Sequence, residues 1–259
     1  MARTFLKGLM MIKKQKLTWI LLSAGCLSHP AWAQSPWTLG ASVLVSPSPY
    51  QGEQDRVMPL PVIGYDSDRF FVQGLSAGAY LWKDQQNQLS LNAYYSPLHF
   101  KASDSDNDAM KQLNNRHATM MGGIGYRHQA SWGTLRTELA TDMLNNSNGF
   151  TGDVAYLYPI ERGDWQLRPG VGVTYSNGKT NDYYYGVSSD ESARSGLSAY
   201  KAGSSWSPYL ELSASYQLTP QWTTFITGRY THLANSITDS PMVDKSGSGM
   251  LWTGVTYRF

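Results

Sequence analysis

The last nine residues of the chain read Leu251-Trp252-Thr253-Gly254-Val255-Thr256-Tyr257-Arg258-Phe259. Side chains of a β-strand alternate between its two faces, so the odd-numbered residues of this stretch share one face. That face is mostly apolar or aromatic and ends on a C-terminal phenylalanine. The pattern predicts the closing strand of a bacterial outer-membrane β-barrel, with Gly254, Tyr257 and Phe259 as a signal for the barrel insertion machinery. Trp252 departs from that pattern, because a polar residue is usual there. The alternative is an edge strand of a soluble β-sandwich.

The N-terminus carries an export signal. Three lysines precede the apolar run Leu17–Leu27, and Ala31-Trp32-Ala33 places small residues, Ala31 and Ala33, around a cleavage site. These features predict a secretory signal peptide over residues 1–33, cleaved before Gln34. The mature chain, residues 34–259, is then expected to be a single barrel domain.

Cys26 raises the alternative of a lipidated protein. The stretch Leu22-Ser23-Ala24-Gly25-Cys26 resembles a lipoprotein signal, but Ser23 lies where leucine is expected. We therefore favour conventional cleavage, which leaves the mature chain without a cysteine and hence without a disulfide.

The charge balance excludes a nucleic-acid-binding surface. Cleavage removes five of the 21 lysines and arginines, which leaves 16 against 19 acidic residues, a net charge of −3. Mean hydropathy is −0.38, yet 13% of residues are aromatic. No later stretch approaches the roughly 20 apolar residues of a membrane-spanning helix. The combination suits a barrel with a lipid-facing apolar band, aromatic girdles and a polar interior.

Alternating apolar and polar segments recur along the chain, separated alternately by short turns and long polar loops. Counting back from the C-terminus to Leu89 gives eight spans with every long loop on the outside. Residues 34–83 are less regular, and three segments there would give an odd total. Splitting Arg69–Trp82 into a hairpin at Gly74–Gly78 gives twelve strands, and demoting one segment gives ten. Because bacterial barrels have even counts, we favour twelve over ten. Pro59 and Pro61 make the strand assignment of one of these segments doubtful, because proline has no backbone N–H to donate to a neighbouring strand.

Charged residues fall on the faces that alternation directs inward. A charge facing hydrocarbon at mid-bilayer costs about 2–4 kcal/mol for arginine or lysine, so these positions are expected to face the lumen. One interpretation is a selective pore, and the one we favour is a set of paired charges that fills a narrow barrel. The candidate lumen charges are Arg136, Glu138, Arg168, Glu211 and Arg229.

No residue set indicates an enzyme, a cofactor or a metal site. The mature histidines are His99, His117, His128 and His232. None has an evident serine and acidic partner for nucleophilic catalysis. The Asp104–Asp108 stretch lacks the glycine and downstream glutamate of a calcium loop. We read it as a solvated loop among lipopolysaccharide phosphates.

Several stretches resemble the MipA/OmpV family of outer-membrane proteins. The most specific are Tyr183-Tyr184-Tyr185-Gly186-Val187, Glu191–Leu197 and Thr238-Asp239-Ser240-Pro241-Met242-Val243. The resemblance implies a scaffold in the outer membrane of a Gram-negative bacterium, linking a murein lytic transglycosylase to a bifunctional penicillin-binding protein in peptidoglycan remodelling. A small passive channel is the alternative, and an envelope hydrolase ranks third.

Strand parity places the motif loops, with Tyr183, Tyr184, Tyr185, Gly186, Ser240, Pro241 and Val243, on the outer side. The murein partners implied by the resemblance lie in the periplasm. Only the short turns, the lower rim and the segment after Gln34 would reach them.

Overall fold

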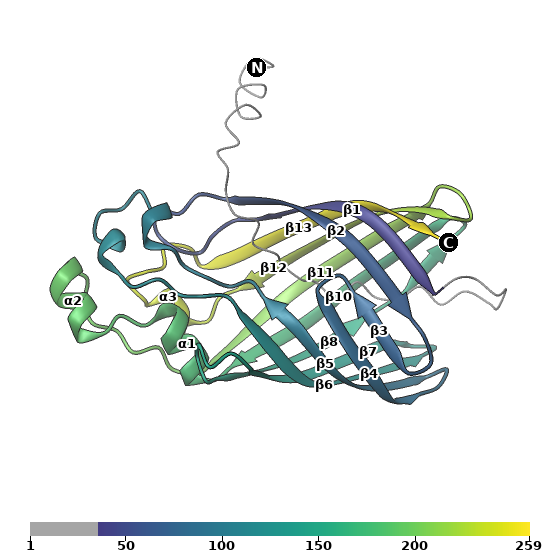
Figure 1. Cartoon of the computed structure of the whole chain (residues 1–259), viewed down its shortest axis with the longest axis horizontal. Coiled ribbons are helices and arrows are strands. Elements are labelled where there is room, and N and C mark those ends of the chain that lie inside the picture. Colours follow the sequence, from purple (N-terminus) through teal and green to yellow (C-terminus); the bar gives the residue numbers. More distant parts are fainter. Residues whose placement is uncertain (1–35) are drawn as a thin grey trace, which may run out of the picture.

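The computed structural model describes residues 36–259, which form an antiparallel barrel with helices in the loops at one end (Figure 1). The expected signal peptide and its expected cleavage site at Ala31–Gln34 lie outside the described residues. The strands are β1 (Trp37–Ser46), β2 (Arg56–Asp66), β3 (Phe70–Gln73), β4 (Ser76–Lys83), β5 (Asn87–Ser96), β6 (Thr119–Ala130), β7 (Gly133–Asp142), β8 (Phe150–Leu157), β9 (Ile160–Arg162), β10 (Trp165–Ser176), β11 (Ser205–Gln217), β12 (Trp222–His232) and β13 (Gly247–Arg258). The helices are α1 (Gly178–Tyr185), α2 (Ser189–Ser195) and α3 (Asn235–Thr238), with 3₁₀ turns η2 (Ala102–Asp104) and η3 (Met110–Gln112).

The sheet closes on itself through two pairings. The first strand lies antiparallel to the last, from Thr38 opposite Arg258 to Val45 opposite Leu251. β10 pairs with β11 along its whole length. β8 and β9 both pair with β10 and are separated only by Tyr158 and Pro159, so they form one interrupted span. The barrel therefore has twelve spans, which confirms the count favoured from the sequence.

Residues 36–83 form four strands, as the favoured twelve-strand count predicted. β3 and β4 form a hairpin around Gly74 and Leu75, and Gly74 adopts a φ of +60° that favours glycine. This hairpin is short, and by dividing the segment into two strands it makes the strand number even. β2 keeps both of its prolines within the strand.

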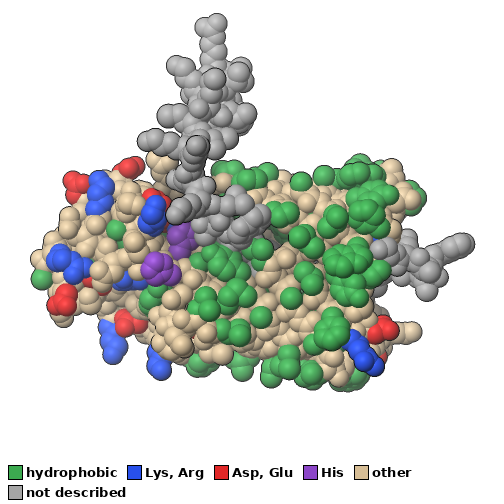
Figure 2. All heavy atoms as spheres, viewed as in Figure 1, with side chains coloured by type: hydrophobic (Ala, Val, Ile, Leu, Met, Phe, Trp, Pro, Cys, Tyr) green, Lys and Arg blue, Asp and Glu red, His purple; other side chains and the backbone are tan. Residues whose placement is uncertain are grey.

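The barrel wall carries its apolar side chains outward. Figure 2 shows hydrophobic side chains distributed over the wall, while most charged ones gather at the loop end. Aromatic pairs mark the levels of the two membrane surfaces, as expected for interfacial girdles. At the end with short turns they are Trp37–Tyr65, Trp165–Tyr216 and Trp222–Tyr257, and at the loop end Phe150–Tyr175 and Tyr175–Trp206. No helix in residues 36–259 is long and apolar enough to cross a membrane.

The closing strand presents its C-terminal aromatics to the outside. The rings of Tyr257 and Phe259 lie 4.9 Å apart, and the Phe259 N–H donates to the Trp37 carbonyl at 3.4 Å. Trp252, the departure noted in the sequence, points inward and is 7% exposed, with its ring 4.7 Å from Phe225. A Cβ at Gly254 would lie 2.9 Å from the Phe225 ring, so glycine leaves room for this packing.

Candidate functional site

The barrel interior holds a compact group of paired charges. The Glu211 carboxylate of β11 accepts from Arg229 Nε of β12 at 3.1 Å and from Arg136 Nη2 of β7 at 3.4 Å. Asp153 of β8 lies 4.0 Å from Arg136 and accepts from the Tyr209 hydroxyl at 2.9 Å. Two arginines thus face two carboxylates, so the group is electrically balanced, as buried charge requires.

Small residues on β10 allow this group to assemble across the strand. A Cβ at Gly172 would lie 2.3 Å from the Tyr209 ring, so Tyr209 can cover the backbone of β10 only because a glycine is there. The Tyr209 ring also lies 4.1 Å from the Arg229 guanidinium, a cation–π distance. The group therefore spans the wall from β7 to β12.

Two of the five candidate lumen charges lie outside this group. Glu138 bonds with the side chains of Tyr94 and Asn92 on β5. Arg168 donates to Gln166 on its own strand at 3.4 Å. The structure therefore joins Arg136, Glu211 and Arg229 by ion pairs, places Glu138 beside them opposite Asp153, and leaves Arg168 apart.

The wall near the barrel's closure is apolar on its inner face. Leu44, Leu60 and Trp252 pack as one cluster, with Met58, Val62, Phe225 and Met250 against it. We call these seven residues the apolar strip. Outer-membrane barrels usually have polar interiors, so this strip stands out from the charged wall.

The mouth with the long loops is covered by a packed core that we call the external cap. It is built from loop residues with Tyr50, Phe100, Met110, Leu113, Tyr184, Tyr185, Val187, Ala202, Leu233, Ile237, Met242 and Val243. By the usual asymmetry of bacterial barrels, this end faces the outside. A direct axial path through the barrel is therefore obstructed.

The family-motif loops interlock inside the cap. The Tyr50 hydroxyl donates to the Tyr184 carbonyl at 3.2 Å, and the Ser240 hydroxyl donates to the Tyr185 carbonyl. The Tyr184 hydroxyl donates to the His117 carbonyl at 3.2 Å. Tyr184 and Tyr185 are buried, because their loops pack against one another. Of the remaining motif residues, Gly186 ends α1, Pro241 follows α3, and Val243 bridges to Tyr50.

A buried ion pair in the cap has no obvious sequence signal. Arg116 Nη2 lies 2.8 Å from Glu191 Oε1, with the two side chains 8% and 3% exposed. The same carboxylate caps its own helix, accepting from the Ser188 N–H at 3.0 Å, and also accepts from the Asn114 N–H at 2.9 Å. Burial opposes ionisation, but these hydrogen bonds and Arg116 together lower the pKa of Glu191. The capping box of Ser188 and Glu191 can be recognised in the sequence, whereas the pairing of Glu191 with Arg116 cannot.

The candidate reactive residues are dispersed. His99 contacts the Pro97 carbonyl at 2.7 Å, and burial lowers the pKa of its imidazole. His128 contacts Asn87, and His232 ends β12. Asp104 and Asp108 each pair with a lysine three residues away. Within residues 36–259, no three His, Cys, Asp or Glu side chains are arranged to hold a metal ion.

The opposite end of the barrel presents short turns. The Asp84 carboxylate accepts from the N–H groups of Gln86 and Asn87 at 2.8 and 2.7 Å, which fixes the β4–β5 turn. Asp66 pairs with Lys83 at 3.0 Å and joins this turn to the one before it. Exposed side chains on this rim include Asp84, Gln129, Arg162 and Gln221.

Comparison with known proteins identifies close relatives. The family model "MltA-interacting protein MipA" matches residues 39–259. The chain is 50% identical over 229 residues to the MltA-interacting protein of Escherichia coli K12, covering 88% of this chain and 92% of the relative. It is 38% identical over 225 residues to the putative outer membrane protein YiaT of the same organism, covering 87% and 92%. It is 31% identical over 159 residues to OmpV of Vibrio cholerae, covering 61% and 62%.

Two solved structures align over most of this chain at low scores. An outer membrane channel from Pseudomonas putida F1 aligns with a TM-score of 0.43 at 11% identity, covering 90% of this chain and 100% of that one. Neisserial surface protein A aligns with a TM-score of 0.31 at 12% identity, covering 88% and 100%.

Proposed function

This chain belongs to the MltA-interacting protein MipA family, and we propose that it is an outer-membrane scaffold that binds a murein lytic transglycosylase at its periplasmic rim. The observation that carries the proposal is the 50% identity to the MltA-interacting protein across 88% of the chain. The finer proposal, that it also links this enzyme to a bifunctional penicillin-binding protein, rests on the family resemblance.

The arrangement of the two ends supports binding at the rim. The outer end is a packed cap whose motif residues are buried against one another, so they support the loops. The short turns carry exposed polar side chains on both sides of the barrel opening, and these are the part of the barrel that reaches the periplasm. A stable interface buries about 1,200–2,000 Å² in total, so several turns must act together.

A small passive channel is the second candidate. It is favoured by the half-buried polar side chains on the inner face near the periplasmic end, such as Ser213, Ser215 and Thr256. It is opposed by the external cap and by the paired charges of Arg136, Glu211 and Arg229. We therefore place the scaffold first and a hydrolase last.

The test is capture by purified partners. An immobilised MltA-type lytic transglycosylase and an immobilised bifunctional penicillin-binding protein are each incubated with the detergent-solubilised barrel. We expect capture by the transglycosylase to fall in rim variants Asp84→Lys, Gln129→Lys, Arg162→Glu and Gln221→Lys, combined in one chain. The control is Asp239→Asn, a substitution at an exposed residue that follows α3 beside the external cap.

The possible results test the binding surface, the first partner and the second partner separately. Loss of capture in the cap variant but not in the rim variant would show that the wrong surface was chosen. No binding of either enzyme by the unaltered barrel would remove the scaffold function. Binding of the transglycosylase alone would leave the scaffold without its second partner.

A further inference from the structure

One edge of β2 lacks a neighbouring strand over most of its length. β2 pairs with β1 from Arg56 to Tyr65, but with β3 only from Gly64 to Asp66. The β3–β4 hairpin turns back at Gly74, whose N–H donates to the Ile63 carbonyl at 2.7 Å. Within residues 36–259, the part of β2 before Ile63 pairs with no strand on that side. We call Val57–Val62 the bare edge.

The two prolines of β2 lie at positions whose backbone groups face the bare edge. In an antiparallel pair, both polar backbone groups of one residue point to the same side. Ile63 points toward the hairpin, whereas Leu60 points toward β1, where its carbonyl accepts from the Ser42 hydroxyl at 3.0 Å. Pro59 and Pro61 share the parity of Ile63, so the N–H groups that proline lacks are those that would face the bare edge. An unpaired N–H in hydrocarbon costs several kcal/mol, and an edge proline also prevents another strand from adding.

Hydrogen bonds connect the two sides of the wall above and below the space between the bare edge and β5. Below it, the Tyr95 N–H of β5 donates to the Leu75 carbonyl at 3.4 Å, which joins β5 to the hairpin tip. Above it, Arg56 at the top of β2 donates to the His99 carbonyl at 3.2 Å. On β2, six residues separate Arg56 from Ile63, about 20 Å at the usual rise, whereas on the β5 side only three residues separate Tyr95 from His99. In Figure 1, β2 and β5 flank this part of the wall.

The inner face behind the bare edge is the apolar strip. Met58, Leu60 and Val62 alternate inward from β2 and pack with Trp252 of β13. The Trp252 side chain is 7% exposed, and its Nε1 has no hydrogen-bond partner among the described residues. An indole Nε1 can only donate, so its missing partner is an acceptor.

We propose that the bare edge is a lateral portal through which a single-chain amphiphile of the outer leaflet, with a hydrogen-bond-accepting head group such as a fatty acid, reaches the apolar strip. The hydrocarbon chain lies against Met58, Leu60 and Val62, and the head group accepts from Trp252 Nε1. The external cap covers the outer mouth, so an amphiphile of the outer leaflet reaches the strip through the wall. This inference is independent of the scaffold function.

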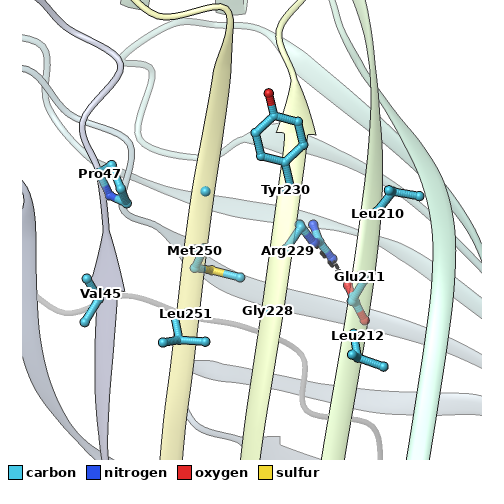
Figure 3. A pocket seen from close by; sticks show the side chains of 11 residues that line it. Val45, Pro47, Leu210, Glu211, Leu212, Gly228, Arg229, Tyr230, Met250 and Leu251 are labelled. Atoms are coloured by element: carbon cyan, nitrogen blue, oxygen red, sulfur yellow. Dashed lines mark hydrogen bonds and ion pairs between the residues drawn. The ribbon is translucent and has the colours of Figure 1, made fainter.

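A second hollow on the wall is distinct from the portal. A groove of about 510 Å³ lies on the outside of β11–β13 and β1, where Gly228 and Gly249 carry no side chains (Figure 3). Outward residues such as Leu210, Tyr230 and Leu251 flank it. It opens to the surrounding lipid, and none of the buried unpartnered polar atoms found in residues 36–259 belongs to a residue that lines it, so it indicates no particular ligand.

The test uses a photoreactive fatty acid with a diazirine in its chain, incorporated into liposomes with the full purified barrel. After illumination, the modified residues are mapped by mass spectrometry. We expect adducts on Met58 and Leu60 in addition to the outward residues that any membrane lipid touches. Adducts confined to outward residues of the unaltered barrel would overturn the proposal without any variant.

Two variants locate the route and the head group. Met58→Trp fills the strip and is expected to suppress inner adducts, whereas Val57→Trp, one residue away and facing outward, leaves them unchanged. Trp252→Phe keeps an aromatic ring but removes the donor. It is expected to lower inner labelling by the fatty acid about fivefold, the scale of one hydrogen bond, without altering labelling by a photoreactive alkane. Equal inner labelling in Met58→Trp and Val57→Trp would contradict the portal. Equal losses for acid and alkane in Trp252→Phe would remove the head-group contact.

Discussion

Arg116 and Glu191 form an ion pair of 2.8 Å inside the external cap, joining the β5–β6 loop to α2. The two residues are 75 positions apart, and both side chains are buried. The Glu191 carboxylate also accepts hydrogen bonds from the Ser188 and Asn114 N–H groups. The pair therefore connects two loops that have no strand pairing between them.

Breaking this pair should loosen the cap while the barrel stays closed. Glu191→Ala leaves the Arg116 guanidinium buried without its partner, a loss of about 3–5 kcal/mol for a fully buried pair. We expect faster proteolysis within residues 97–118 and 177–204, with heat-modifiable gel mobility unchanged. Asp190→Ala, an exposed neighbour on α2, is the control. Equal protease resistance in the two variants would contradict the role of the pair.

The cap should also respond to acid through Glu191. Its pKa is lowered in the folded protein, so the stabilisation is present above the unfolded pKa of about 4.3 and is lost as pH falls through the lower folded pKa. We expect hydrogen exchange in α2, corrected for intrinsic rates, to rise below about pH 4. Because other carboxylates titrate there, the measured quantity is the difference from Glu191→Gln. A pH dependence that is the same in both proteins would contradict this assignment.

The sequence predicted the architecture because the strands of a barrel wall repeat the same alternation of outward apolar and inward polar residues. Outward residues must be apolar, so alternation in β10 or β13 reveals each span without knowledge of its neighbours. The even strand number then required the hairpin at Gly74. The prolines of β2 remained ambiguous, because their meaning depends on which edge lacks a neighbour.

The site could be predicted only in part. Inward charges such as Arg136 and Glu211 were identifiable by parity, but their mutual contact depends on how Tyr209 crosses Gly172. The pairing of Arg116 with Glu191 depends on the path of two long loops, and loops carry no periodicity. The inward Trp252 was noticed as a departure, and its meaning required the apolar strip around it.

Export should follow conventional cleavage. The residues around Ala31 and Ala33 favour cleavage before Gln34, and Ser23 weakens the lipoprotein signal at Cys26. We expect the intact mass of the membrane-extracted protein to match a chain that begins at Gln34. A mass that includes an acylated Cys26 would show the alternative.

The C-terminal aromatics should control assembly. Tyr257 lies against Trp222 at 5.1 Å and against Phe259 at 4.9 Å, on the lipid-facing row of the closing strand. Deleting Phe259, or replacing Tyr257→Asp, is expected to slow insertion and direct the chain to periplasmic degradation. Thr256→Ser, on the lumen face of the same strand, is the control. Outer-membrane levels equal to the control in both altered proteins would separate these residues from the insertion signal.

The paired lumen charges should keep steady conductance low. Glu211 neutralises Arg136 and Arg229 together, and the external cap covers the outer mouth. We expect little steady conductance from the purified barrel in planar bilayers. Glu211→Gln removes the carboxylate that Arg136 and Arg229 share, so it should lower the barrel's unfolding temperature by destabilising the β7–β12 side of the wall. Arg168→Gln, outside the group, is the matched control. Stable conductance steps in the unaltered barrel, with a size changed by Glu211→Gln but not by Arg168→Gln, would instead identify the charge group as the lining of an open pore and favour the channel over the scaffold.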